Sequence, residues 1–384
     1  MKRSPKGEEL SETSPNQSIA IAYALEGSRS EAVYHGSCGG TNLAAERALR
    51  KLAEKLKVKL QDLKVCYEAG PTGFVLARRL LQLKVECVVM SPSKTDRKPN
   101  ERIKTDKRDA KKIAKIFRNG DIVEVRIPPA LDEAVRDLCR ARTDASDDLA
   151  RSKQRLNFFL LRNGFRYDQK TKWTDAHMRY LRHLTLPDPT QALVLEGYLQ
   201  AIDACVERVQ SFEEKMKQVL VDWEWRPVVE ALMACKGFKE VAAMTIISEL
   251  GDLRRFKSPR PLMAFLGLVP SEESTGNKHR QGSITKCGNG HARWMLCESA
   301  QAYRREPKIS AQLSKRQDGQ PHEVKALSWR MQKRLSKRYR HLRARGIRDS
   351  KCIVAIAREL IAFIWELQNK LKLPIPASGA TDAS

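Results

Sequence analysis

The run TDKRDA at residues 105–110 places two carboxylates, Asp106 and Asp109, three positions apart in the chain. On a helix this spacing projects both side chains from the same face, where they can share one cation. Hard cations such as Mg²⁺ prefer clustered carboxylate oxygens. Lysines and arginines surround the pair, so the alternative is that the two acids only offset local charge repulsion.

Glu68 is a candidate third oxygen ligand, because it ends an expected strand and α/β sheets collect ligands at the carboxyl ends of their strands. Two metal ions held by such acids can activate an attacking oxygen and stabilise the leaving oxygen in phosphodiester chemistry. The sequence GPTG at 70–73 is not a phosphate-binding P-loop. It could instead mark only a tight connection from strand to helix.

A later segment, residues 267–289, combines small hydroxyl side chains, glycines and bases, and we expect it to be a basic loop. This composition permits close backbone approach to a phosphate and electrostatic stabilisation of a pentavalent transition state. It does not single out a nucleophile, because most loop serines form turns. The stretch KGFK at 236–239 is similar to a helix-turn-helix turn and weakly indicates contact with the DNA backbone.

The charge balance indicates a polyanionic partner. Lysine and arginine number 71 against 46 acids, which gives a formal charge of +25 and a pI near 9.8. Residues 308–351 alone hold fourteen bases and three acids, interleaved with Trp329 and Tyr339, which suits contacts to nucleic-acid backbone. The alternatives are a basicity that serves only solubility or generic RNA binding, and a solvated charged helix over 308–351.

The sequence argues against membrane, zinc and disulfide chemistry. No stretch approaches the ~18 apolar residues of a membrane span, and the first residues lack the apolar core of a signal peptide. The nine cysteines form no CxxC pair, so we interpret them as reduced and mostly buried thiols. We therefore expect the protein to stay in the cytoplasm.

Strands and helices alternate in the amino-terminal part of the chain, which predicts an α/β layer. We expect this layer to position the candidate acids. The apolar patterns predict strands at 19–23 and 32–34 joined at Gly27, a helix at 43–56, a strand at 63–67, a helix at 74–83, a strand at 87–90, a helix at 105–117 and a strand at 122–125.

Two long runs follow, at 131–159 and 195–223, with apolar residues every three or four positions. They form either a coiled-coil-like antiparallel hairpin or part of an ordinary helical bundle, and periodicity does not separate these two readings. Behind them the pattern predicts a helical domain with helices in 228–250 around Gly237, at 291–303 and at 353–371.

Four motifs, taken together and in order from about residue 60 to 305, resemble the DEDD transposases, relatives of the Piv-type DNA invertases. They are CYEAGPTG at 66–73, RIKTDKRDAKKIAKIF at 102–117, ELGDLRRFKSPRPLMAFLGLVPSEESTG at 249–276 and GSITKCGNGHAR at 282–293. The resemblance implies an amino-terminal α/β RuvC-like (RNase H-like) domain and a carboxy-terminal transposase domain. We expect the latter to be mostly α-helical, with a long coiled-coil-like helical hairpin between the two domains.

The resemblance also assigns the metal ligands, four acids that bind Mg²⁺ (or Mn²⁺). The family's glutamate falls on Glu68 and its closing pair on Asp106 and Asp109. The family's first aspartate has no counterpart here, because residues 18–24 contain no acid. Glu12 is the nearest substitute by position and Glu26 a poorer one, or else this copy has a damaged metal site.

The family's serine-bearing stretch maps onto residues 270–276, which makes Ser274 the expected nucleophile and Ser271 the second choice. Thr275 occupies a position where relatives carry serine. A helix-hairpin-helix-like element corresponds to Gly237 onward, with Lys239 in place of its second glycine.

The resemblance implies a site-specific recombinase of a mobile element that acts on donor and target DNA. It also implies a bridge-type noncoding RNA as guide and a homo-oligomer, a dimer or tetramer, with no membrane partner. Two rivals stay open, a RuvC-like nuclease that hydrolyses DNA and an inactive nucleic-acid-binding descendant. The bases expected to contact nucleic acid are Lys104, Lys107, Arg108, Lys278, Arg280, Lys286, Arg293, Arg334 and Arg338.

We expect five segments along the chain. They are a flexible amino terminus (1–18), a RuvC-like metal-binding domain (19–127), a coiled-coil-like helical region (128–226), a serine-bearing transposase domain with the basic segment (227–372) and a disordered tail (373–384).

Overall fold

The structure, a computed structural model, describes residues 18–70, 73–91, 105–169, 171–275 and 278–370. The chain divides into two compact units, residues 1–127 and 128–384. Glu12, Lys104 and the expected carboxy-terminal tail lie outside the described residues. Within the described part, no helix is long and apolar enough to cross a membrane.

The first unit is an α/β layer with two short strand pairs. Strands β1 (Ser18–Tyr23) and β2 (Val33–Gly39) form the expected antiparallel hairpin, with a register shift after Ile21. Strands β3 (Lys64–Glu68) and β4 (Glu86–Met90) pair in parallel, as alternation of strand and helix predicts. The two pairs are separate sheets among the described residues.

Three helices accompany these strands: α1 (Asn42–Leu56), α2 (Val75–Gln82) and α3 (Asp106–Arg118). Apolar residues of α1, α2, β3 and β4 form one core, which includes Leu49, Leu80 and Val89. The expected last strand at 122–125 shortens to a single bridge between Glu124 and Met90, flanked by backbone hydrogen bonds from Ser91 to Val123 and from Val125 to Val89.

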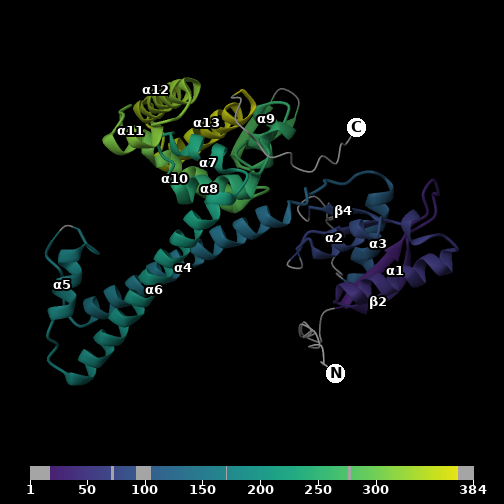
Figure 1. Cartoon of the computed structure of the whole chain (residues 1–384), viewed down its shortest axis with the longest axis horizontal. Coiled ribbons are helices and arrows are strands. Elements are labelled where there is room, and N and C mark those ends of the chain that lie inside the picture. The colour runs from purple at the N-terminus through teal and green to yellow at the C-terminus, as the bar shows by residue number, and fades with distance from the viewer. Residues whose placement is uncertain (1–17, 71–72, 92–104, 170, 276–277, 371–384) are drawn as a thin grey trace, which may run out of the picture. The chain divides into compact units, whose positions relative to one another are not determined.

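The second unit begins with two long helices, α4 (Ala130–Arg162) and α6 (Pro189–Asp222), which pack against each other (Figure 1). At 1.5 Å per residue each helix is about 50 Å long. The short helix α5 (Asp175–His183) lies at the end where the chain turns from one long helix to the other (Figure 1). Of the two readings left open by periodicity, the structure has the antiparallel helical hairpin.

This hairpin takes part in two hydrophobic cores. Near its base, Val135 and Met216 belong to the main core of the unit. At its far end, Leu156 and Ile202 belong to a separate cluster with residues of α5. At the base the buried carboxylate of Asp132 accepts hydrogen bonds from the indole nitrogens of Trp223 and Trp225, at 2.9 and 3.1 Å, which fastens the start of α4 to the end of α6.

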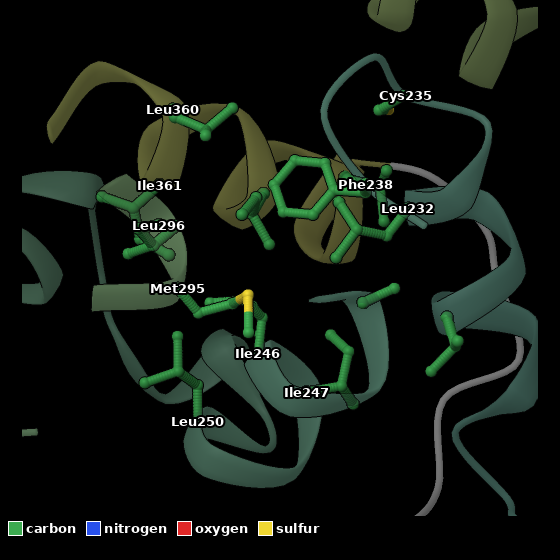
Figure 2. Close-up of a cluster of buried hydrophobic side chains, with 14 of the residues drawn as sticks. Leu232, Cys235, Phe238, Ile246, Ile247, Leu250, Met295, Leu296, Leu360 and Ile361 are labelled. Carbon is green, nitrogen blue, oxygen red and sulfur yellow. The ribbon is translucent and has the colours of Figure 1, made fainter. Parts of the chain in front are cut away.

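The remaining helices surround the main core, where Phe238, Ile246, Leu296 and Leu360 meet (Figure 2). They are α7 (Arg226–Met233), α8 (Glu240–Leu250), α9 (Pro259–Phe265), α10 (Gly290–Ala300), α11 (Ala311–Gln317), α12 (His322–Ala344) and α13 (Asp349–Lys370). Short 3-10 turns at Leu60–Asp62, Leu253–Arg255 and Gln301–Arg304 complete the regular structure.

The segment expected to be a basic loop is instead a β-hairpin. Strands β5 (Pro270–Thr275) and β6 (Lys278–Ile284) are antiparallel, with Thr275 opposite Lys278. The physical reason is in the sequence, because only Gly276 and Asn277 separate the two strands and Gly-Asn is a known two-residue hairpin sequence. Polar composition concealed this hairpin, since neither strand has a strongly apolar face.

Candidate functional site

The expected nucleophile, Ser274, lies in β5 one residue before its end, and its backbone pairs with His279 of β6. The hairpin therefore carries Ser274 close to its turn, in a strand rather than in an irregular loop. The opposite strand supplies two of the expected phosphate contacts, Lys278 and Arg280. The second choice, Ser271, donates a hydrogen bond to the carbonyl of Ser283 at 3.2 Å, across the base of the same hairpin.

Two glycines fix the base of this hairpin. Gly267 and Gly288 both have positive φ, at 61° and 74°. A Cβ on Gly267 would collide with the backbone of Cys287, and a Cβ on Gly288 would collide with the carbonyl of Phe265. Only glycine allows these two chain segments to approach so closely.

Arg293 of α10 reinforces the same junction from the side. Its Nη1 donates to the carbonyls of Leu266 and Cys287, at 2.9 and 3.1 Å. The backbone N–H of Lys286, at the exposed side of the junction, donates to the carbonyl of Gly267 at 3.1 Å. The structure thus gives Arg293 a role in holding the hairpin, while the expected contacts of Lys286 and Arg293 with nucleic acid stay predictions.

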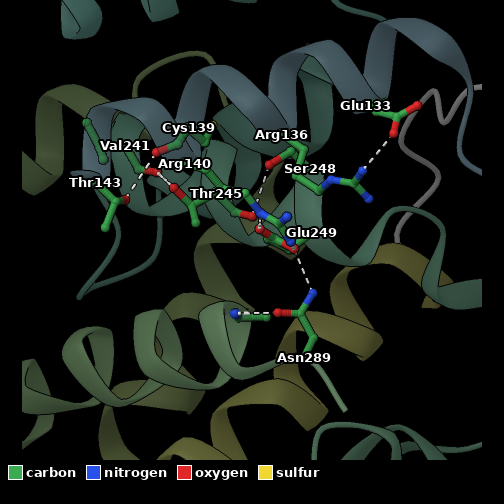
Figure 3. A network of polar contacts seen from close by, with 11 residues as sticks. Glu133, Arg136, Cys139, Arg140, Thr143, Val241, Thr245, Ser248, Glu249 and Asn289 are labelled. Carbon is green, nitrogen blue, oxygen red and sulfur yellow. Dashed lines mark hydrogen bonds and ion pairs between the residues drawn. The ribbon is translucent and has the colours of Figure 1, made fainter. Parts of the chain in front are cut away.

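A polar network that the sequence did not reveal joins α4, the end of α8 and Asn289 (Figure 3). The side chain of Glu249, at the end of α8, is fully buried and accepts two hydrogen bonds from Arg140 of α4, at 2.7 and 2.9 Å. It also accepts one from Asn289 Nδ2 at 2.6 Å. The hydrogen bonds to Glu249, more than any other influence, raise the pKa of Arg140.

Asn289 links this network to the hairpin. Its Oδ1 accepts the backbone N–H of Ala292 at 2.9 Å and so caps α10. Asn289 directly follows Gly288, one of the two glycines at the hairpin base. Contacts therefore run from α4 through Glu249 to Asn289, which is next in the chain to the base of the hairpin. Two features of the sequence could have pointed to this network: ELGD at 249–252, which contains Glu249, and the helix-capping asparagine in GNGH at 288–291.

In the first unit, Asp106 and Asp109 occupy the first turn of α3, which Thr105 caps through the N–H of Arg108. Asp106 is exposed and Asp109 half-buried. Acids in a first turn also interact favourably with the positive end of the helix dipole.

Helix α3 contacts β1, β2 and β3. Lys107 lies 5.3 Å from the centre of the Tyr34 ring in β2, and Arg118 donates to the carbonyl of Ser30 at 2.5 Å. Both contacts hold α3 along the first hairpin. Arg108, another expected nucleic-acid contact, is exposed at the start of this helix.

Glu68 ends β3 and is exposed, so its carboxylate is open to ligands. The turn that follows is held by Tyr67, whose hydroxyl donates to the carbonyl of Gly73 at 3.0 Å. Glu68 lies on a strand that contacts the helix of Asp106 and Asp109. In donor type and accessibility the three carboxylates fit a hard cation.

No three His, Cys, Asp or Glu side chains gather into a possible metal site among the described residues. The structure thus brings the elements of Glu68, Asp106 and Asp109 into contact without bringing their carboxylates together. The fourth expected acid, Glu12, lies outside the described residues. The metal centre stays a prediction.

The basic segment 308–351 forms α11 and α12. Helix α12 buries Met331 and Leu335, and its basic face pairs with acids of α13. Arg334 and Arg338 both approach Glu359, at 3.0 and 3.4 Å, and both remain largely exposed. Their positive charge is therefore reduced by one shared acid but is still presented to solvent.

The turn between α7 and α8 packs inside the protein. Gly237 has a φ of 95°, and a Cβ there would approach the carbonyl of Ser299 to 2.6 Å. Tyr303 donates to the carbonyl of Lys236 at 2.5 Å, and Arg316 donates to that of Phe238 at 3.0 Å. Burial lowers the pKa of Lys236. These contacts explain the glycine by packing, and contact of the turn with DNA stays a prediction.

Comparison with known proteins gives two family models that match separate parts of the chain. One is described as transposase of the DEDD type and matches residues 38–163. The other is described as transposase, IS116/IS110/IS902 family, and matches residues 229–314. The second match covers α8, the serine-bearing hairpin and α10.

Several curated proteins are similar over most of the chain. A putative transposase of Sinorhizobium fredii is 36% identical over 353 residues, which is 92% of this chain and 86% of the relative. The transposase for insertion sequence element IS1533 of Leptospira borgpetersenii is 31% identical over 300 residues, 77% of this chain and 87% of the relative.

Proposed function

Because this chain belongs to the IS116/IS110/IS902 family and is a DNA transposase of an insertion sequence, we propose that it cuts and rejoins DNA through Ser274. The observation that carries this proposal is the placement of Ser274 on a β-hairpin whose base is held by close backbone packing and whose other strand carries Lys278 and Arg280. A phosphate diester of the DNA backbone is the group that such a surface would receive.

In the proposed first step the Ser274 hydroxyl loses its proton and its oxygen forms a bond to phosphorus, while the bond from phosphorus to one DNA oxygen breaks. The departing oxygen takes up a proton, which leaves a DNA end linked to the protein as phosphoserine. In the second step the hydroxyl of another strand end attacks the phosphoserine, and Ser274 regains a proton. The number of phosphodiester bonds is conserved, so no external energy source is required.

Glu68, Asp106 and Asp109 are the residues that we propose to hold divalent metal ions, Mg²⁺ or Mn²⁺, together with a fourth acid for which Glu12 is the candidate. Such ions supply charge stabilisation for the phosphoryl group in transfer. The oxygen donors of these carboxylates and the exposure of Glu68 and Asp106 support this assignment.

We propose further that the enzyme uses a structured noncoding RNA of its own element as guide and works as a homo-oligomer on donor and target DNA. The formal charge of +25 and the exposed bases of α12 support binding of more than one polyanion. In such an oligomer, acids of one protomer and Ser274 of another would form a composite site.

The test is covalent trapping of purified full-length protein with RNA from the element's flanks, donor and target DNA, and Mg²⁺. A protein-linked DNA band on a denaturing gel is expected for the native protein and is expected to vanish in Ser274→Ala. Ser283→Ala, on the opposite strand of the same hairpin, is the matched control and should keep the band.

Two results would contradict the proposal. Free cleaved ends without a protein-linked band would indicate hydrolysis, with the serine merely structural. Strand exchange that persists in Ser274→Ala would move the nucleophile elsewhere, in the first instance to Ser271.

A further inference from the structure

The far end of the α4–α6 hairpin encloses a cavity of about 190 Å³. Its walls come from the last turns of α4, the connection between α4 and α5, and α5 itself. The side chains that matter for its chemistry are Asn157, Arg166, Tyr167, Lys172, His177 and Tyr180. We call this cavity the tip pocket, and neither the acids of the first unit nor the serine-bearing hairpin contributes to it.

The aromatic rings of the tip pocket are arranged around His177. The Tyr167 ring lies 4.5 Å from that of His177 and 5.1 Å from that of Tyr180, measured between ring centres. These separations are typical of favourable aromatic pairs. Both tyrosines are only half-buried and both line the pocket, so part of each side chain is accessible from it. Aromatic rings that line a pocket can stack on a further planar group.

His177 is itself buried, and its position is set by an unusual backbone. Its Nδ1 accepts the backbone N–H of Trp173 at 3.0 Å, and Trp173 has a φ of 64°, which a bulky residue rarely adopts. Burial, with a smaller contribution from Lys172, lowers the pKa of His177. The ring is therefore neutral at pH 7, with its proton on Nε2. A neutral planar donor suits a nucleobase better than a phosphate.

The chain segment that lines the tip pocket is basic, although Arg182 in it pairs with Asp203 of α6. Residues 151–183 contain nine lysines and arginines against two acids. Arg166 and Lys172 on the pocket wall are exposed, and Lys172 is oriented by a 2.6 Å hydrogen bond to Asn157. Lys153 lies 5.4 Å from the centre of the Trp173 ring. This excess charge attracts a phosphate backbone to the rim while the rings offer stacking faces within.

We propose that the tip pocket binds an unpaired base of a single-stranded nucleic acid, which stacks on Tyr167 and Tyr180 while Arg166 and Lys172 meet the flanking phosphates. Unpaired bases stacked on aromatic side chains are the usual basis for recognition of single strands, and a duplex keeps its bases out of reach. The pocket has room for one planar ring system. This inference is independent of the serine chemistry, because it concerns binding at the opposite end of the helical hairpin.

The test uses the full-length protein and a short unstructured RNA that carries one photoreactive 4-thiouridine. Irradiation is expected to crosslink the base within residues 166–180, as mapped by mass spectrometry. Tyr167→Leu keeps apolar bulk but removes the ring, and we expect it to weaken binding about five- to 100-fold, the range for one stacked base. Phe158→Leu is the matched control, because Phe158 is an exposed aromatic of α4 outside the pocket, and it should bind like the native protein.

Lys172→Gln is a second variant that changes only a surface charge, and it should lower both affinity and its dependence on salt concentration. Binding of single-stranded DNA of the same sequence shows whether the unpaired base belongs to RNA or to DNA. Weaker binding of either RNA or single-stranded DNA by the Tyr167→Leu protein supports the proposed pocket. Crosslinks outside residues 151–183 with unchanged affinity of both variants would overturn the proposal. An equal loss of duplex DNA binding in Tyr167→Leu would also overturn it. A Ser274→Ala protein should bind the RNA normally whether or not Ser274 is the nucleophile.

Discussion

Replacement of Glu249 by glutamine tests how the serine-bearing hairpin is held in place. Glutamine has nearly the same shape but removes the negative charge and one acceptor. The carboxylate now accepts three hydrogen bonds, two from Arg140 and one from Asn289. The amide oxygen of glutamine can accept at most two of them. Its NH₂ group, which is a donor, then faces the remaining donor of Arg140 or Asn289 inside the protein.

The expected cost follows from these contacts. A hydrogen bond to a charged group contributes about 1.5–3 kcal/mol, and breaking a fully buried ion pair costs about 3–5 kcal/mol. The Arg140 side chain is 47% exposed, so water replaces part of what it loses. We therefore expect Glu249→Gln to lower the free energy of unfolding of the second unit by about 2–4 kcal/mol. That corresponds to a fall in melting temperature of roughly 4–15 °C.

The assay is calorimetric and denaturant unfolding of the variant beside two others. The double variant Glu249→Gln with Asn289→Asp returns a carboxylate to the network, still caps α10, and lets the new amide donate to it. It should recover at least half of the loss. Glu230→Gln removes an exposed partner of Arg226 and serves as control, with an expected effect below about 1 kcal/mol.

The reasoning would be refuted if Glu249→Gln and Glu230→Gln had the same stability, or if the double variant were less stable than Glu249→Gln alone. A further readout is the protein-linked DNA band. If the network positions the hairpin, the band should weaken more in Glu249→Gln than DNA binding does, and it should return with the double variant.

Two further predictions concern the hairpin base and the thiols. Gly267→Ala should destabilise the protein by about 3 kcal/mol or more, because the strain of a positive φ adds to a collision with the backbone of Cys287. Gly346→Ala is the control, because Gly346 has a φ of 75° but open space around it, and it should cost only about 1–2 kcal/mol. Equal melting temperatures of the two variants would count against the collision. Burial raises the pKa of Cys235 to about 12, so its thiol stays protonated at pH 8 and should escape alkylation in the native protein. The exposed Cys287 should be modified under the same conditions. Mass spectrometry that finds Cys235 labelled before the protein is unfolded would contradict this prediction.

Local patterns in the sequence predicted much of the secondary structure. Thr105 before a basic amphipathic run placed the start of α3 within one residue, and the paired apolar runs gave both long helices. The choice between hairpin and bundle was beyond periodicity, because it depends on which distant residues share a core. Val135 and Leu156 lie on the same helix face yet belong to different clusters.

The candidate site was only partly predictable for a related reason. Spacing and strand position suggested Glu68 and the two aspartates, motif resemblance suggested Ser274, and the chemistry of all four residues stays a prediction. The contacts that support them come from residues far apart in the chain, such as Arg140 with Glu249 and Asn289. No local pattern distinguishes Arg140 from the other arginines of α4, since its role depends on a buried acid 109 positions away.

The length of the helical hairpin means that a small rotation at its base would move its far end a long way. Its base is fastened by Asp132 to Trp223 and Trp225, whereas its far end makes its own small core. Along an arm of about 50 Å, a turn of roughly 10° at the base displaces the tip by about 9 Å. A small adjustment where α4 meets Glu249 is thus magnified at the tip pocket, so a strand held there would swing through several ångströms while the helices themselves stay rigid.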